Sequence, residues 1–455
     1  MRPAAGMPAS KSNSIPRLML VLILCLSAFV QSTVVSRTVV DYPLRADAGE
    51  YFAYAFNSKY FGVYSSAKTW ATPTETAPTP DKMRSPGYPF FLRLVGPPEP
   101  TERYIRKVTI WQAGLGVLSV WLTFLIAASF VARPLALLVA LAVAINPHLA
   151  NMSSLLLTES LFVFLLLASV LSLQKAVQSR SFVLFALTGV LWGLCSLVRP
   201  TTQYFPVLLL LAVFTLPALR SYARPALLAF ACFIAMLAPW VVRNQSVPEV
   251  KGANIMVNTL AHGSYPGFMY ENRPETFGFP YRFDPALAEK TQDLPTILKS
   301  IAGSVKSDPA TYAHWYLLGK PYFFLSLENV QAFDIYIYPT LRTPYMEDRS
   351  FDSMRRITVA LHWPLMILGL AGALLLFVRP QVLGLNAASV QSGRIVAALI
   401  LYAILFHMVV APFPRYAIPF RPLLFALAAL PIGATWFAIG RKQESPSTAG
   451  PGYVP

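Results

Sequence analysis

Long runs of apolar residues without charge are the feature that most limits how this chain can fold. A helix needs about 20 such residues to cross the roughly 30 Å hydrocarbon core of a bilayer. Hydrophobic residues make up 55% of the 455 positions and charged residues only 13%, about half the charged share of soluble domains. The sequence therefore predicts an all-α polytopic membrane protein with about ten transmembrane helices, at 18–35, 108–131, 134–150, 154–173, 181–198, 203–219, 225–242, 357–378, 395–411 and 417–439.

The first of these runs also has features of a secretory signal, because it follows Arg2, Lys11 and Arg17 and has a short apolar core. No clear Ala-x-Ala cleavage site comes after it. We therefore expect the segment to be retained as the first membrane helix, and a cleaved signal is the alternative.

The distribution of basic residues tests this assignment. With the N-terminus in the cytoplasm, alternate loops face alternate sides of the membrane, and the cytoplasmic loops should hold the excess of Lys and Arg. Most of the net charge of +16 is explained in this way. No cytoplasmic loop is long enough to form a basic folded surface, which argues against nucleic-acid binding. The cytoplasmic set contains one acid, Glu444, and twelve bases: Arg2, Lys11, Arg17, Arg133, Lys175, Arg180, Arg220, Arg224, Arg379, Arg394, Arg441 and Lys442.

The same topology divides the chain into six parts. We expect interfacial helices at 47–62 and 308–325. Because both long loops face outward, we expect the functional site there. The parts are a cytoplasmic N-terminus with the first membrane helix (1–35), a first extracytoplasmic loop with the candidate catalytic acid (36–107), membrane helices two to seven (108–242), a large extracytoplasmic loop of mixed structure (243–356), membrane helices eight to ten (357–439), and a cytoplasmic tail expected to be disordered (440–455).

The spacing of cysteines and histidines argues against several kinds of site. Cys25, Cys195 and Cys232 all lie in apolar runs, so we expect no disulfide. The five histidines show no zinc-binding spacing, and the chain contains no phosphate-binding loop of the nucleotide enzymes. We therefore expect neither a zinc site nor nucleotide chemistry on the cytoplasmic side.

An acidic cluster follows the first apolar run. Asp47 and Glu50 begin a helical pattern that continues through Phe52, Tyr54 and Phe56. A carboxylate at the membrane surface is placed to act as a general base on a lipid-linked substrate. The structural alternative is that Asp47 interacts with the helix dipole and Glu50 completes a capping box. Charge spacing alone favours that alternative.

Six stretches of the chain resemble motifs of one enzyme family. Each motif is short, but in this order they cover nearly the whole chain. Because of these motifs taken together, the chain resembles the GT-C glycosyltransferases that use polyprenyl-phosphate sugars. This group includes protein O-mannosyltransferases and lipid A aminoarabinose transferases. The stretches are ADAGEYFAYAFNSKYFGVYS from residue 46, RSPGYPFFLRLV from 84, NPHLANMSSLLLTESLFVFLL from 146, GLCSLVRPTTQYFPVLL from 193, APWVVRNQ from 238 and FPRYAIPFRPLL from 413.

The resemblance implies a GT-C-like fold in a multi-pass enzyme of the cytoplasmic membrane, with an extracytoplasmic active site. It implies inverting transfer of a hexose or pentose from a polyprenyl-phosphate donor to a lipid, glycan or protein acceptor, without a metal or other cofactor. Asp47 is the implied general base, and Glu50 and Glu159 are further implied catalytic acids. Glu50 lies three residues from Asp47, although the family pattern has adjacent acids. A structural ion pair with a nearby arginine is the alternative for Glu159.

Basic residues near the outer ends of the apolar runs are candidates for binding the donor phosphate. They are Arg199, Arg243 and Arg415, with Lys320 in HWYLLGKPYFF as a weaker candidate. A guanidinium group binds phosphate oxygens bidentately and stabilises charge that develops on a leaving group. Snorkelling of each side chain to lipid headgroups is the alternative.

Two other classes of function remain open from the sequence. Ten spans also suit a secondary transporter, although no internal repeat is visible. A noncatalytic membrane assembly protein that binds through its outer loops is the second. An enzyme of the resembled class should gather Asp47, Glu159 and the arginines around one outer cavity, whereas a transporter should show a pathway through the bilayer.

Overall fold

The computed structural model describes residues 14–72, 74–248, 254–267, 279–327 and 335–444, and these residues are mostly helical. Within them the one sheet has two short antiparallel strands, β1 (Val39–Val40) and β2 (Thr340–Arg342). The prediction of an all-α fold is therefore confirmed. The predicted disordered tail is 440–455; residues 440–444 are helical, and the remainder lies outside the described residues.

Each of the ten predicted apolar runs corresponds to an apolar helix. Among the described residues, seven helices are long and apolar enough to cross a membrane, so the prediction of a polytopic membrane protein is confirmed. Three others are shorter, and their crossing of the bilayer stays a prediction. The seven are α1 (Ser14–Arg37), α4 (Glu102–Ala127), α7 (Glu159–Ser179), α10 (Ala223–Gln245), α17 (Arg349–Val378), α18 (Ala387–Val409) and α20 (Arg421–Glu444), and the three are α5 (Arg133–Ala144), α8 (Phe182–Val198) and α9 (Phe205–Thr215).

A short helix and the turns that follow it explain why the structure departs from one predicted boundary. Asn146 caps the short helix α6 (Pro147–Met152), because its side chain accepts a hydrogen bond from the Leu149 amide at 3.2 Å. Residues 153–158 then form turns, and α7 begins only at Glu159. The fourth predicted run therefore starts five residues too early, because a continuous apolar stretch does not reveal an interruption of the helix.

The long outer segments contain most of the short helices. The predicted interfacial segments are both helical, although their position at a membrane surface stays a prediction. The first outer segment holds α2 (Ala46–Tyr60) and α3 (Gly87–Val95); the second holds α11 (Ile255–Gly263), α12 (Leu287–Lys290), α13 (Leu294–Ser307), α14 (Pro309–His314), the π-helical turn η4 (Trp315–Gly319), α15 (Lys320–Leu325) and α16 (Pro344–Glu347).

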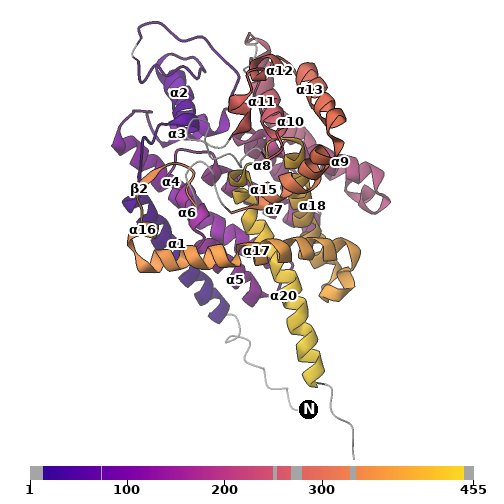
Figure 1. The fold of residues 1–455 in the computed structure, drawn as a ribbon. Helices are drawn as coiled ribbons and strands as arrows, with labels where there is room; N and C mark the ends of the chain where they lie inside the picture. Colours follow the sequence, from indigo (N-terminus) through magenta and orange to yellow (C-terminus); the bar gives the residue numbers. More distant parts are fainter. Residues whose placement is uncertain (1–13, 73, 249–253, 268–278, 328–334, 445–455) are drawn as a thin grey trace, which may run out of the picture.

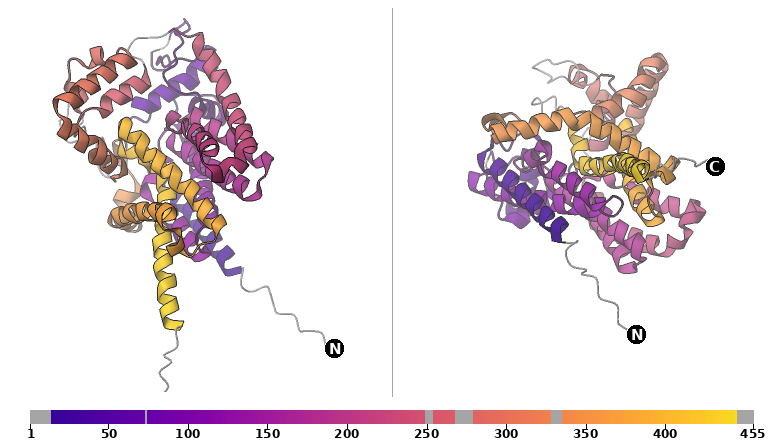
Figure 2. Two further views of the ribbon diagram at one scale, coloured as in Figure 1. Left: turned by 90° about the vertical axis from the view of Figure 1, so that its right-hand side faces the viewer. Right: turned by 90° about the horizontal axis from the view of Figure 1, so that it is seen from below.

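Helices from both long segments lie at one end of the molecule. Figure 1 shows α2, α11 and α13 at this end, whereas α20 runs toward the opposite end, where α1 begins. A view turned by 90° shows the same separation (Figure 2). This arrangement is the one expected if both long loops face one side of the membrane and both chain ends face the other.

Close crossings between helices depend on glycine. A Cβ atom on Gly189 of α8 would lie 2.0 Å from the Ala229 carbonyl oxygen of α10. On Gly372 of α17 it would lie 2.2 Å from the Leu427 carbonyl oxygen of α20. Small residues at such crossings let membrane helices approach closely without a hydrophobic driving force between them.

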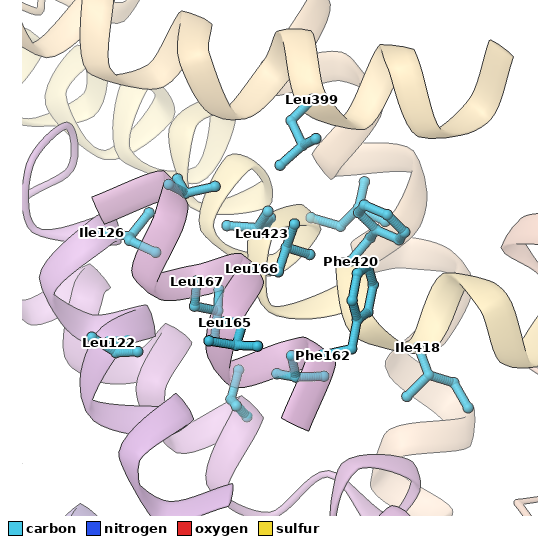
Figure 3. Close-up of a cluster of buried hydrophobic side chains, with 14 of the residues drawn as sticks. Leu122, Ile126, Phe162, Leu165, Leu166, Leu167, Leu399, Ile418, Phe420 and Leu423 are labelled. Carbon is cyan, nitrogen blue, oxygen red and sulfur yellow. The ribbon is translucent and has the colours of Figure 1, made fainter. Parts of the chain in front are cut away.

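The centre of the bundle is packed around α7. Figure 3 shows Leu165 and Leu166 of α7 near Ile126 of α4 and Leu423 of α20. All four side chains are buried. This packing fixes α7 against η6 (Ile418–Phe420), the turn that leads into α20, and α7 begins at the charged site described below.

The topology can be tested with reporter fusions. A reporter placed after Arg180, between α7 and α8, should lie on the cytoplasmic side, and one placed after Asp308, between α13 and α14, should lie outside. A fusion after Glu444 serves as the control and should match the first. Alkaline phosphatase and fluorescent-protein activities report the two sides. The same side for Arg180 and Asp308 would contradict the topology.

Candidate active site

Six charged side chains form a continuous chain of ion pairs, which we call the ion-pair chain. Three are acids and three are arginines, and they come from segments far apart in the sequence. Each acid contacts at least one arginine. Because the acids and the arginines are equal in number, their charges balance. In spatial order the members are Glu50, Arg84, Asp47, Arg415, Glu159 and Arg199.

Asp47 lies at the centre of the ion-pair chain, in the first turn of α2. Its Oδ1 atom accepts a hydrogen bond from Nη2 of Arg84 at 2.8 Å, and its Oδ2 atom accepts one from Arg415. The side chain is 21% exposed. Both carboxylate oxygens are therefore engaged, yet the group is accessible from solvent.

A tight turn before α2 sets the position of Asp47. Ala46 has a positive φ of 44°, and the chain folds back so that the Leu44 carbonyl lies directly against α2. A Cβ atom on Gly49 would lie 2.4 Å from that carbonyl oxygen. Glycine is therefore the residue that fits here, and Ala-Asp-Ala-Gly encodes the close approach.

Arg84 joins Asp47 to Glu50. Its Nε donates to Oε2 of Glu50 at 2.8 Å, and its guanidinium group lies 5.4 Å from the ring centre of Tyr51. The Tyr64 hydroxyl donates to the Arg84 carbonyl at 3.0 Å and fixes the backbone. Sequence reasoning did not select Arg84 as a site residue, although it is the arginine of the RSPGYP motif.

Glu159 and Arg199 form the buried end of the ion-pair chain. Glu159 is the first residue of α7 and is only 1% exposed. Its Oε1 lies 3.2 Å from Nη1 of Arg199 and 3.9 Å from Nε of Arg415. The Arg199 guanidinium also lies 4.8 Å from the ring centre of Tyr416. The structural alternative considered for Glu159, an ion pair with a nearby arginine, is thus what the structure contains.

Arg415 connects the two ends of the ion-pair chain. It lies in α19 (Pro414–Ala417), between the end of α18 and the start of α20. Pro414 and Pro419 interrupt the helical hydrogen bonds here, so α18 and α20 do not join into one helix. The break leaves the arginine side chain between the carboxylates of Asp47 and Glu159.

Arg243, predicted to bind phosphate, holds the backbone of the first outer loop. Its Nη1 donates to the Asp81 carbonyl at 2.5 Å and its Nη2 to the Tyr64 carbonyl at 3.1 Å. The guanidinium also lies 5.1 Å from the ring centre of Trp240. Because Asp81 and Tyr64 flank the segment that leads to Arg84, this contact supports the loop, and a direct role with phosphate stays a prediction.

Lys320 is the first residue of α15, and its ammonium group lies against the C-terminal end of α18. Its ammonium donates to the carbonyls of Val409 at 3.1 Å and Val410 at 3.2 Å, and it lies 3.9 Å from the ring centre of Tyr316. A cation at this position satisfies carbonyls that the helix leaves unpaired. Burial lowers the pKa of Lys320 to about 7. Its predicted role in phosphate binding stays a prediction.

Two neighbouring arginines decide the direction in which the pKa of Asp47 is shifted. Burial alone would raise the pKa of its carboxyl group, but the charges of Arg415 and Arg84 outweigh burial and lower the pKa below its usual value. Asp47 is therefore ionised at neutral pH. No cluster of three or more His, Cys, Asp or Glu residues able to hold a metal ion occurs among the described residues.

The chain is similar to one protein family and to several solved structures. The family described as dolichyl-phosphate-mannose-protein mannosyltransferase matches residues 89–242. No curated protein matches the chain. Among solved structures, the oligosaccharyltransferase AglB from Archaeoglobus fulgidus, in complex with an inhibitory peptide and a dolichol-phosphate, is similar with a TM-score of 0.47 and 14% identity, over 98% of this chain and 53% of that one. ArnT from Cupriavidus metallidurans, bound to undecaprenyl phosphate, is similar with a TM-score of 0.39 and 13% identity, over 96% of this chain and 82% of that one.

The chain spans about half the length of AglB. The family match runs from α3 to the end of α10, and over these residues the resemblance to polyprenyl-phosphate-sugar glycosyltransferases is confirmed. Glu159 and Arg199 lie inside the matched segment, whereas Asp47, Arg84 and Arg415 lie outside it.

Removing Arg84 should raise the pKa of Asp47. Loss of one opposite charge in Arg84→Gln should move the pKa upward by about 1 to 3, because a neighbouring cation typically lowers a carboxyl pKa by that amount. Carbodiimide labels the protonated carboxyl group, so the pH midpoint of Asp47 labelling, followed by peptide mass spectrometry, should rise. Arg93→Gln is the matched control, because Arg93 is exposed on α3 outside the ion-pair chain. Equal midpoints in the two variants would contradict the assigned pairing.

Proposed function

We propose that the protein is an inverting glycosyltransferase of the cell membrane, which transfers a sugar from a polyprenyl phosphate to a hydroxyl or amine of a lipid, glycan or protein on the extracytoplasmic face. One observation carries the proposal most strongly. Asp47, the accessible carboxylate, is held directly beside arginines that suit phosphate, at the end of the molecule where both long loops gather.

The donor phosphate binds Arg415 and Arg199 in this proposal. The donor phosphate is a diester with one negative charge, like a carboxylate, and its two terminal oxygens match the guanidinium fork, so it competes with Asp47 for Arg415. Once Arg415 turns to the phosphate, Oδ2 of Asp47 becomes free. Glu159, buried between the two arginines, keeps both of them oriented.

The chemical step is a single displacement at the anomeric carbon. Asp47 takes the proton of the acceptor hydroxyl or amine, and the acceptor atom forms the new bond to the sugar. The bond between the sugar and the phosphate oxygen breaks, and the polyprenyl phosphate leaves with that electron pair. Arg415 and Arg199 stabilise the charge on the leaving group. Attack from the face opposite to the phosphate inverts the configuration.

The release of Arg415 also adjusts the basicity of Asp47. A carboxylate paired with two arginines is a weak base, because its pKa lies below the usual value. When the phosphate takes Arg415, one of the two stabilising cations is withdrawn and the pKa of Asp47 rises. Donor binding thus prepares the base in the complex where it is needed.

An apolar cavity provides a site for the polyprenyl chain. Its volume is about 800 Å³, and Arg394 is the only charged residue in its lining. The cavity reaches Trp192 on α8, about two helical turns before the end of that helix, which Arg199 directly follows. A phosphate at Arg199 and a lipid tail in the cavity are therefore compatible with one bound molecule. An apolar lining also suits a lipid better than the polar pathway that a transporter needs.

Asp47→Asn tests the proposed base. The amide keeps the volume but has no basic oxygen, and loss of a general base typically costs about 10² to 10⁴ in rate. Purified protein in lipid nanodiscs is incubated with a panel of undecaprenyl-phosphate sugars, and released undecaprenyl phosphate is measured. Asp41→Asn is the control, since Asp41 pairs only weakly with Arg45, at 3.9 Å, outside the ion-pair chain. Turnover of Asp47→Asn within a few-fold of wild type would remove Asp47 as the base.

Arg415→Lys tests phosphate binding. Lysine keeps the charge but loses the planar fork, so the KM for the donor should rise or kcat should fall, by about tenfold or more for a loss of about 1.4 kcal/mol. Arg220→Lys is the control, because Arg220 is exposed in η2 (Pro217–Tyr222). Donor saturation curves distinguish binding from snorkelling, since a snorkelling arginine tolerates lysine. Wild-type curves for both variants would exclude Arg415 from the donor site.

A further inference from the structure

We infer that Gln112 is a positioning residue for the proposed transfer, because its side chain joins the segment that carries Arg84 to the segment that leads into Glu159. This inference rests on the proposed function. Gln112 lies within the membrane helix α4 and is completely buried. A buried amide in such a helix is costly unless its hydrogen bonds are satisfied.

The segment that leads into Glu159 is residues 153–158, the interruption between α6 and α7. All six residues are buried, yet they form turns rather than a helix or strand. Their backbone groups therefore lack the regular hydrogen bonds of a helix, at a depth where water does not replace them. Glu159 follows directly, so the shape of this interruption decides where the buried carboxylate of the ion-pair chain lies.

Gln112 supplies hydrogen bonds that the interruption lacks. Its Nε2 donates to the Ser153 carbonyl at 3.1 Å and to the Leu155 carbonyl at 2.8 Å. The two acceptors lie in the first half of the interruption, 41 and 43 residues along the chain from Gln112. Both amide hydrogens are thus used to hold one short piece of irregular backbone.

The oxygen of the same amide reaches the other segment. The Tyr88 hydroxyl donates to Oε1 of Gln112 at 2.6 Å. Tyr88 lies in α3, four residues after Arg84, and its ring packs edge-on against Tyr51 with 5.3 Å between ring centres. A Cβ atom on Gly87 would lie 2.8 Å from the Leu197 carbonyl oxygen, so α3 also packs tightly on α8 just before Arg199.

Only an amide of this length can make all three bonds at once. Glutamate has no donor for the two carbonyls, leucine has neither donor nor acceptor, and asparagine is one methylene shorter. Gln112 therefore sets the distance between the Arg84 side and the Glu159 side of the ion-pair chain. Asp47 and Arg415 lie between these sides, so an error in that distance changes how they face each other.

Gln112→Leu tests the inference, with Gln174→Leu as a matched control. Gln174 is also completely buried, and its amide donates to the Ser392 carbonyl of α18 at 3.1 Å, away from the ion-pair chain. Both variants lose a buried amide from a membrane helix, so both should lose thermal stability. Only Gln112→Leu should lower kcat per folded molecule, by about tenfold or more, because a misplacement of about 1 Å costs up to about 100-fold. Tyr88→Phe, which removes one of the three bonds, should lower kcat by a smaller factor.

Two readouts separate this inference from the proposed function. Release of undecaprenyl phosphate measures transfer, and its absence in the wild type would overturn the proposed function. The pH midpoint of carbodiimide labelling at Asp47 needs no turnover, and it should rise in Gln112→Leu and stay at the wild-type value in Gln174→Leu. If the midpoint in Gln112→Leu also stays at the wild-type value, or if both variants lose kcat equally, Gln112 only stabilises the fold and the positioning role is wrong.

Discussion

The buried carboxylate of Glu159 is the constraint on which the rest of the site depends. A carboxyl group that is 1% exposed at the start of a membrane helix is costly to bury unless an opposite charge lies beside it. Arg199 lies 3.2 Å away and supplies that charge. Arg199 in turn follows the last residue of α8, so the ion pair fixes the outer ends of α7 and α8 relative to each other. Arg415 extends the pairing to Asp47, and the same constraint thereby reaches the accessible acid.

Such charge compensation requires interruptions of the helices, and each interruption needs its own hydrogen bonds. Glu159 follows turns at 153–158, whose carbonyls are held by Gln112. Arg415 lies in the proline-rich break after α18, and Lys320 binds the carbonyls at the end of that helix. Irregular backbone at membrane depth is tolerated where protein groups replace water. The buried polar side chains around the site are therefore part of its architecture.

The sequence predicted the parts of the fold that depend on local pattern. The apolar runs and the helical start at Asp47 follow from residue spacing, which local periodicity records. The partners of Asp47 do not, because Arg84 and Arg415 are 37 and 368 residues away and only the tertiary fold brings them together. Arg199 and Arg243 looked equivalent, since both end apolar helices. One joins the ion-pair chain and the other holds a loop, a difference that the one-dimensional pattern does not contain.

The balance of charge in the ion-pair chain implies that the donor binds before the acceptor in the proposed reaction. The ion-pair chain holds three acids and three arginines, so it has no spare cation for a phosphate. A donor phosphate therefore enters only by displacing a carboxylate. Glu159 is buried and Glu50 is paired with Arg84, which leaves Asp47 as the group to be displaced from Arg415. The displaced oxygen is the one that accepts the proton in the proposed step, so an acceptor that arrives first meets a base whose two oxygens are both occupied. Donor binding thus precedes productive acceptor binding as a consequence of charge balance.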